Sequence, residues 1–203
     1  MWALGLTGSI ATGKSTVLRM FAEMGVPVFS SDDAVHELYR GAAVAPVEAL
    51  FPGVSRNGEI DRAELSRRVL GRPDKLKALE SVVHPLVRER IGQFLRDAQS
   101  TGSGLAIVDI PLLFEGGHDY GLDRVAVTAA APETYRARAL ARPGMTVEKL
   151  EAILARQMPQ DEKIKRADYV IYTDESLDET RAAVKAIVDD LSKTPRPPHR
   201  TIE

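Results

Sequence analysis

The chain has 203 residues, of which 44% are hydrophobic and 28% are charged, and its formal net charge is −2. This composition is typical of one globular domain with insertions, and the weak charge gives no reason to expect nucleic acid or an anionic membrane as a partner. The absence of cysteine excludes a disulfide framework, a thiol nucleophile and a cysteine-ligated metal.

The same features indicate a cellular setting. No run approaches the ~20 apolar residues that a membrane-spanning helix needs. The first expected strand begins at Met1 or Trp2, so we expect no targeting peptide before it. A cysteine-free chain also suits a reducing cytoplasm. We expect a cytoplasmic protein, and for its assembly a monomer or a weak homo-oligomer.

The first strand, Trp2–Thr7, leads into Gly8-Ser9-Ile10-Ala11-Thr12-Gly13-Lys14-Ser15. This segment matches G-x-x-x-x-G-K-[ST], the phosphate-binding loop of nucleotide hydrolases and kinases. The two glycines let backbone N–H groups converge on phosphate, and the helix that begins near Gly13 adds its positive end. Lys14 is expected at the β- and γ-phosphates and the Ser15 hydroxyl on Mg²⁺.

A second strand, Val26–Phe29, is followed by Ser30-Ser31-Asp32-Asp33. A carboxylate at this place could accept the proton of an acceptor hydroxyl or hold Mg²⁺ through water. The alternative is helix capping, which is worth ~1 kcal/mol. Position alone leaves both roles open for Asp32 and Asp33.

The region from Ala34 to Ser100 is expected to be helical and poor in strands, with turns at residues 51–53 and 57–58. His84 and Arg88 lie one helical turn apart at a helix junction and could both contact a phosphate, or they could be a capping histidine and a solvated arginine. The helix candidates are Asp32–Arg40, Val44–Leu50, Asp61–Leu70, Arg72–Val83 and Pro85–Ala98.

The remaining strands are expected at Leu105–Asp109, Arg124–Thr128 and Tyr169–Tyr172, before a closing helix at Leu177–Leu191 and a disordered tail at Thr194–Glu203. Continuous apolar strands that alternate with helices predict a parallel sheet with ligands at the carboxyl ends of its strands.

The strand Leu105–Asp109 and the residues after it contain further candidate site residues. Asp109 has the place of the metal-side carboxylate of phosphate-loop proteins, or it simply closes a turn. Leu112 and Leu113 follow it and could line a pocket or pack in the core. Further on, a cationic segment could close over the phosphates and stabilise transferred charge, or be a wet helix face. Its cations are Arg136, Arg138, Arg142, Arg156, Lys163, Lys165 and Arg166.

These pieces, in this order, resemble the dephospho-coenzyme A kinases, a family of phosphate-loop kinases, from Leu4 to about Leu191. The Leu-Glu-x-x-x-His-Pro and Pro-Leu-Leu-Phe-Glu blocks distinguish this family among small kinases. The matching segments are Gly5–Ile10, Val26–Phe29, Leu79–Arg88, Asp109–Glu115, Arg156–Met158 and Lys165–Ile171.

The resemblance implies an α/β, three-layer P-loop NTPase fold with a five-stranded parallel sheet. It implies transfer of the γ-phosphate of ATP, with Mg²⁺, to the ribose 3′-hydroxyl of dephospho-coenzyme A. The implied divisions are a nucleotide-binding core (1–31, 101–137 and 168–193), a helical coenzyme-A-binding domain (32–100), a lid (138–167) and the tail (194–203).

The resemblance also implies roles for single residues. Asp32 becomes the base and, with Ser15, a Mg²⁺ ligand, while Arg138 and Arg142 of the lid neutralise transferred charge. The nucleotide would be held by Gly8, Ala11, Thr12, Gly13, Lys14, Ser15 and Thr16. The substrate would be held by His84, Arg88, Asp109, Leu112 and Leu113.

The chain departs from the family pattern at three places. The common Asp-Ala-Asp triplet reads Ser30-Ser31-Asp32, so one carboxylate near Mg²⁺ is missing, for which Asp33 could compensate. Ala11 replaces a common glycine and keeps the loop's N–H donors if its φ is negative. Thr173-Asp174 stands where an asparagine often helps hold adenine.

Two other functions stay open on the sequence. One is another small-metabolite kinase, acting on a nucleoside monophosphate or a shikimate-like alcohol. The other is a nucleotide-dependent switch without a small-molecule acceptor. The chain lacks a guanine-reading Asn-Lys-x-Asp after the fourth strand, and its long insertions favour a kinase.

Overall fold

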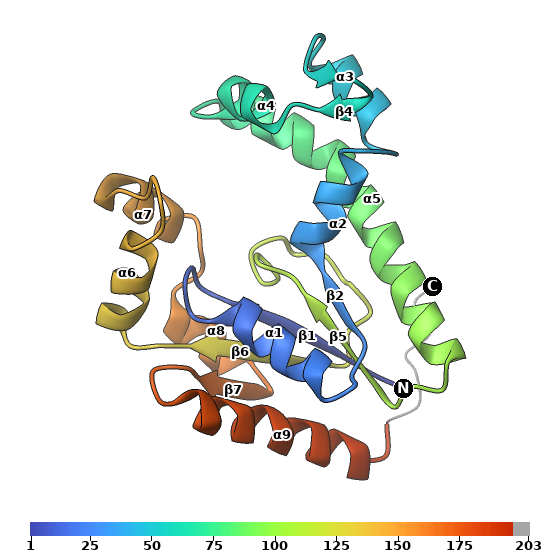
Figure 1. The fold of residues 1–203 in the computed structure, drawn as a ribbon, viewed down its shortest axis with the longest axis vertical. Coiled ribbons are helices and arrows are strands. Elements are labelled where there is room, and N and C mark those ends of the chain that lie inside the picture. Colours follow the sequence, from blue (N-terminus) through green and yellow to red (C-terminus); the bar gives the residue numbers. More distant parts are fainter. Residues whose placement is uncertain (197–203) are drawn as a thin grey trace. The chain divides into compact units, whose positions relative to one another are not determined.

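A computed structural model of the chain describes residues 1–196 and centres on one five-stranded sheet (Figure 1). Its strand order is β2-β5-β1-β6-β7, and β1 pairs in parallel with β5 and β6, as does β6 with β7. The predicted five-stranded parallel sheet is confirmed. The strands are β1 (Trp2–Gly8), β2 (Val28–Ser30), β5 (Leu105–Asp109), β6 (Arg124–Ala129) and β7 (Tyr169–Tyr172).

The centre of the sheet forms the main core. All seven residues of β1 are buried, which explains the unbroken apolar run of the sequence. Helices α1 (Lys14–Glu23) and α9 (Leu177–Lys193) pack together against the sheet, with Phe21 and Val184 fully buried in one cluster with Leu4 and Ile107. Between β6 and β7 the chain forms α6 (Pro132–Leu140), α7 (Val147–Leu154) and α8 (Gln160–Arg166), of which α8 contacts β6.

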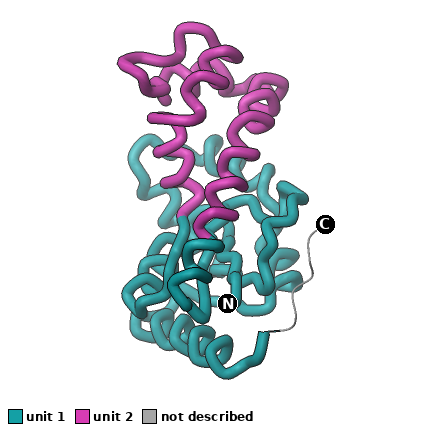
Figure 2. Tube along the Cα trace, turned by 90° about the vertical axis from the view of Figure 1, so that its right-hand side faces the viewer, with its two compact units in different colours: residues 1–29, 95–203 teal, residues 30–94 magenta. Residues whose placement is uncertain are grey.

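Residues 30–94 form a compact unit of their own, distinct from the unit that contains the sheet (Figure 2). This unit holds α2 (Ser31–Leu38), α3 (Val44–Leu50), β3 (Ser55–Arg56), β4 (Glu59–Ile60), α4 (Arg62–Val69) and most of α5 (Pro73–Ser100). The expected turn at Asn57-Gly58 is present with positive φ at both residues, and it closes a short antiparallel hairpin, β3–β4, that the sequence did not predict.

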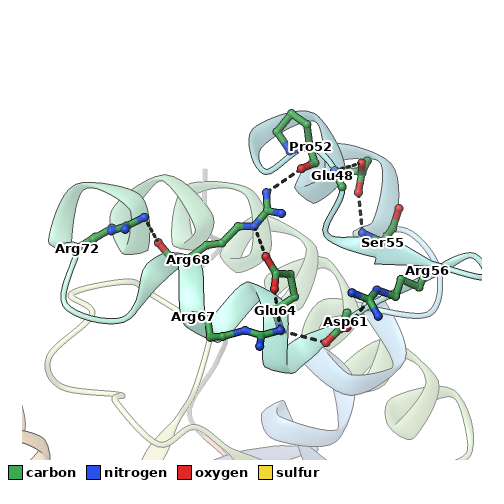
Figure 3. Close-up of polar contacts among 10 residues, drawn as sticks. Glu48, Pro52, Ser55, Arg56, Asp61, Glu64, Arg67, Arg68 and Arg72 are labelled. Atoms are coloured by element: carbon green, nitrogen blue, oxygen red, sulfur yellow. Dashed lines mark hydrogen bonds and ion pairs between the residues drawn. The ribbon is translucent and has the colours of Figure 1, made fainter.

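Charged side chains connect the short elements of this second unit (Figure 3). Arg68 donates to Glu64, one turn away on α4, and to the carbonyl of Pro52 in the loop after α3. Glu48 of α3 accepts hydrogen bonds from the backbone N–H of Gly53 and of Ser55. These bonds to backbone lower the pKa of Glu48.

Helix α5 contradicts the predicted pair of helices, Arg72–Val83 and Pro85–Ala98. It runs unbroken from Pro73 to Ser100 with Pro85 inside it. A proline in a helix removes one hydrogen bond and strains the preceding turn. Here a stripe of buried apolar residues at four-residue spacing continues through the proline and keeps the helix in place. The stripe is Leu79, Val83, Val87 and Ile91.

The predicted tail begins differently from expectation. Thr194 closes α9, and its carbonyl accepts a hydrogen bond of 3.0 Å from the Trp2 indole. Arg196 forms an ion pair of 2.8 Å with Asp123. These contacts contradict disorder at residues 194–196, and the rest of the predicted tail, 197–203, lies outside the described residues. No helix within residues 1–196 is long and apolar enough to cross a membrane.

Candidate active site

The loop between β1 and α1 has the closed form that a phosphate nest requires. A Cβ at Gly8 would lie 2.1 Å from the Thr128 hydroxyl oxygen, so a side chain is sterically excluded there. Gly13 caps α1 with φ +81° and leaves the first N–H groups of the helix without a side-chain acceptor. Thr12 bonds back to the Ser9 carbonyl through its hydroxyl, at 2.8 Å. A helix end that no side chain caps favours an anion.

Ala11 differs from the sequence-based condition that its φ be negative, because its φ is +61°. A left-handed alanine costs ~1–2 kcal/mol relative to the ordinary helical region. Its methyl group is buried in a small apolar cluster with Ala139 of α6 and Leu150 of α7. Burial of one methyl group returns about 0.8 kcal/mol. Packing of α6 and α7 on the loop therefore offsets much of the strain.

Lys14 and Asp109 form an ion pair beside the loop. Asp109 ends β5, next to Leu6 of the paired strand β1, and is 3% exposed. The structure thus brings together two predicted site residues, with the lysine charge paired to a carboxylate. Ser15 follows on the first turn of α1 and is exposed.

Thr173, after β7, supports the loop from beneath. Its hydroxyl lies 3.0 Å from the Thr12 carbonyl oxygen and 3.3 Å from the Ala129 carbonyl oxygen. Arg138 of α6 donates to this hydroxyl and to the Thr173 carbonyl, at 3.1 and 2.7 Å. Both Arg138 and Arg142 are exposed, and these bonds hold Arg138 at the base of the loop. Sequence reasoning noted Thr173 only as a departure in base recognition and missed this support.

Three of the seven cations of the α6–α8 segment are paired with carboxylates. Arg136 pairs with Glu151, and Lys165 pairs with Glu162 on the exposed surface. Lys163 is fully buried, and its ammonium lies 2.8 Å from Glu115. The expectation that Lys163 belongs to a closing cationic surface is therefore wrong: this lysine is part of the interior.

Glu115 is the last residue of the Pro-Leu-Leu-Phe-Glu block, and sequence reasoning assigned it no role. Its Oε1 accepts the backbone N–H of Met158 at 2.8 Å in addition to its contact with Lys163. Burial acts to raise the pKa of Glu115, but the close Lys163 ammonium and the hydrogen bond from the Met158 N–H outweigh it, so that the pKa is lowered. The Glu115 carboxylate therefore stays ionised at neutral pH.

Of the two predicted substrate leucines, Leu112 is 44% exposed and Leu113 is 8% exposed. Leu113 is thus a core residue, as the alternative interpretation had it, and only Leu112 is available to a ligand. Beside the loop, a cavity of about 340 Å³ opens between Ser9, α6 and the segment after α7.

The other predicted site residues belong to the unit of residues 30–94 (Figure 2). Asp32 and Asp33 are exposed in the first turn of α2, whose cap is the Ser30 hydroxyl, an acceptor for the Asp33 N–H at 3.1 Å. The alternative interpretation, that Asp32 or Asp33 caps this helix, is therefore wrong. His84 and Arg88 project from the interior of α5, so the capping role considered for His84 is also wrong.

Several known proteins are similar to this chain. A family model described as dephospho-CoA kinase matches residues 2–179. A dephospho-CoA kinase from Brucella melitensis is 52% identical over 195 residues, covering 96% of this chain and 98% of the relative. A solved structure of dephospho-CoA kinase from Campylobacter jejuni is 26% identical with a TM-score of 0.67, covering 95% of this chain and 98% of that one.

A shikimate kinase from Bacteroides thetaiotaomicron shares the fold alone, with 12% identity and a TM-score of 0.55 over 94% of this chain and 98% of that one. The range that the family model matches contains the phosphate loop and both blocks that distinguish the family. The chain belongs to the dephospho-CoA kinase family.

Proposed function

We propose that the chain transfers the γ-phosphate of ATP to the ribose 3′-hydroxyl of dephospho-coenzyme A, giving coenzyme A and ADP. The observation that supports this most is the closed phosphate loop, with its uncapped helix end and its lysine, in a chain that matches the family over nearly its whole length. Family membership supplies the acceptor, and the loop supplies the means to bind the donor.

At the donor end, the backbone N–H groups from Ala11 to Thr16 would surround the phosphates. Lys14 would exchange the Asp109 carboxylate for oxygens of the β- and γ-phosphates, which brings its charge to the bond that breaks. The 3′-oxygen forms the new bond to the γ-phosphorus while the bond to the β-phosphate oxygen breaks. The negative charge on that oxygen leaves with ADP.

The donors near the loop fit Mg²⁺, which prefers hard oxygen ligands and usually takes one or two from the protein. The Ser15 hydroxyl is exposed on the first turn of α1, and the Asp109 carboxylate ends the neighbouring strand. Ser15 would be the direct ligand, with Asp32 as the second ligand that the family pattern implies. Bound Mg²⁺ supplies neutralisation of the phosphate oxygens.

At the acceptor end, we propose Asp32 as the group that takes the 3′-hydroxyl proton. Its carboxylate is exposed, and the cap of α2 is provided by Ser30, so capping does not occupy it. Arg142 is the exposed cation of the α6–α8 segment that we assign to charge stabilisation, and Arg138 joins it from the base of the loop. His84, Arg88 and Leu112 remain our candidates for substrate contacts.

The test is a coupled ADP assay that compares dephospho-coenzyme A with nucleoside monophosphates and shikimate. We expect turnover with dephospho-coenzyme A to exceed the others. Asp32→Asn should lower this turnover by about 10²–10⁴-fold, far more than it weakens ATP binding. Asp33→Asn is the matched control and should have a far smaller effect. Faster turnover of another acceptor, or ATP hydrolysis that ignores every acceptor, would contradict the proposal. The cytoplasmic location and the assembly state stay predictions.

A further inference from the structure

We propose that Gln157 is a positioning residue that holds the tip of the phosphate loop from the α6–α8 segment, and that the Glu115–Lys163 pair holds Gln157 in place. The proposal rests on the proposed function in one respect, because it assumes that the loop binds ATP. It concerns two residues of the family blocks, Glu115 and Gln157, that the reaction itself does not use.

The first step is a hydrogen bond to the loop from a distant residue. The Ile10 N–H donates to Gln157 Oε1 at 3.0 Å, between residues 147 positions apart. Ile10 precedes the N–H groups, Ala11 to Thr16, that would face phosphate. The bond fixes the Ser9–Ile10 peptide plane, which lies one residue before Ala11, whose φ is +61°. Gln157 therefore restrains the backbone that leads into the strained residue of the nest.

The tip of the phosphate loop, Ile10 and Ala11, has packing partners and also lies beside a cavity. Ile10 and Ala11 pack against α6 and α7 through Ala139 and Leu150. A cavity of about 340 Å³ borders the same region, and Ser9 and Gln157 both line it. Packing around the tip is therefore incomplete at this cavity. The Gln157 hydrogen bond adds a directional contact there.

The third step is what fixes Gln157. Its backbone N–H bonds to the Leu154 carbonyl at the end of α7, at 3.1 Å. The next N–H, of Met158, donates to Glu115 Oε1, and the same oxygen lies 2.8 Å from the Lys163 ammonium. The backbone on both sides of the Gln157 side chain is thus anchored, on one side by a buried ion pair. Such support lowers the entropy that the side chain loses when it bonds the loop.

Loss of this contact should therefore weaken nucleotide binding and leave the acceptor site unaffected. Gln157→Met keeps the length of the side chain and removes the acceptor. We expect it to weaken ADP binding and raise the KM for ATP by ~2- to 10-fold, the range for loss of one hydrogen bond. The KM for dephospho-coenzyme A should not change.

The matched control is Gln160→Met. Gln160 lies at the start of α8, and its side-chain amide bonds the N–H and the carbonyl of Ala130, at 3.1 and 3.0 Å, after β6. The Gln160→Met variant should be less stable than the parent and should bind ADP with the affinity of the parent. If both variants weaken ADP binding equally, the effect is general loosening of the segment and the proposal is wrong.

ADP affinity is measured by calorimetry on the full chain, and hydrogen exchange of the peptide that contains Ile10 reports the contact directly. Exchange should accelerate in Gln157→Met and return to the parent rate in Gln157→Glu, which restores an acceptor at the same length. Unchanged exchange in Gln157→Met would overturn the proposal. Neither ADP affinity nor hydrogen exchange depends on the substrate that accepts the phosphate. A parent protein that fails to phosphorylate dephospho-coenzyme A would therefore contradict the proposed function alone.

Discussion

Replacement of Lys163 by methionine tests the buried ion pair of this protein most directly. The change keeps the length of the side chain and removes the charge, which leaves Glu115 without its partner. Removing one member of a buried pair costs ~3–5 kcal/mol because the remaining charge stays desolvated. The Lys163 side chain is 0% exposed and that of Glu115 is 15% exposed, and Glu115 keeps the Met158 N–H. We therefore expect a loss of unfolding free energy near the lower limit, about 3 kcal/mol.

The pH dependence of the unfolding free energy should change sign in Lys163→Met. In the parent, the pKa of Glu115 is lowered from its ordinary 4.5, because Lys163 and the Met158 N–H outweigh the effect of burial. The stability that Glu115 contributes is thus present above pH 4.5 and lost as the pH falls through the lower folded value. In Lys163→Met, burial prevails and raises the pKa of Glu115. Stability should then increase as the pH falls from about 7 to about 5.

The assay is urea denaturation followed by circular dichroism across this pH range. The double variant Glu115→Gln, Lys163→Met is the companion measurement, since it leaves no buried charge and should recover a large part of the loss. If Lys163→Met stays within about 1 kcal/mol of the parent, or if its stability depends on pH as that of the parent does, the argument from burial is refuted.

Three further predictions concern local structure. Ala11→Gly should keep the unfolding free energy within about 1 kcal/mol of the parent, because relief of the left-handed alanine is offset by loss of a buried methyl group; a loss above ~2 kcal/mol in denaturant titration would contradict this. Ser30→Ala should cost ~1 kcal/mol in the same titration by removing the cap of α2, whereas Ser30→Asp should keep the cap. Tyr169 has a pKa raised to about 12 by burial and by its hydrogen bond to Asp190. Asp190→Asn should lower that pKa, and an ultraviolet titration of tyrosinate that shows no change would disagree.

Local patterns were sufficient for much of the fold and for the centre of the site. The strands Leu105–Asp109 and Tyr169–Tyr172 and the helix Val44–Leu50 were predicted with the bounds that the structure has. The phosphate loop was predicted because its glycines, lysine and serine are consecutive in the chain. In each case the residues that decide the conformation are neighbours, so their order in the sequence carries the physical information.

Tertiary packing decided the rest. Pro85 should end a helix by its local preference, but the buried stripe of α5 outweighs one lost hydrogen bond. Ala11 has a positive φ, and burial of its methyl group by α6 and α7 offsets much of the strain. The Lys163 charge indicated a solvated helix face, and its burial depends on a carboxylate on a distant segment. Sequence alone specified the residues that can bind phosphate, whereas contacts between distant segments specified how rigidly they are held, because such contacts form only when the chain is folded.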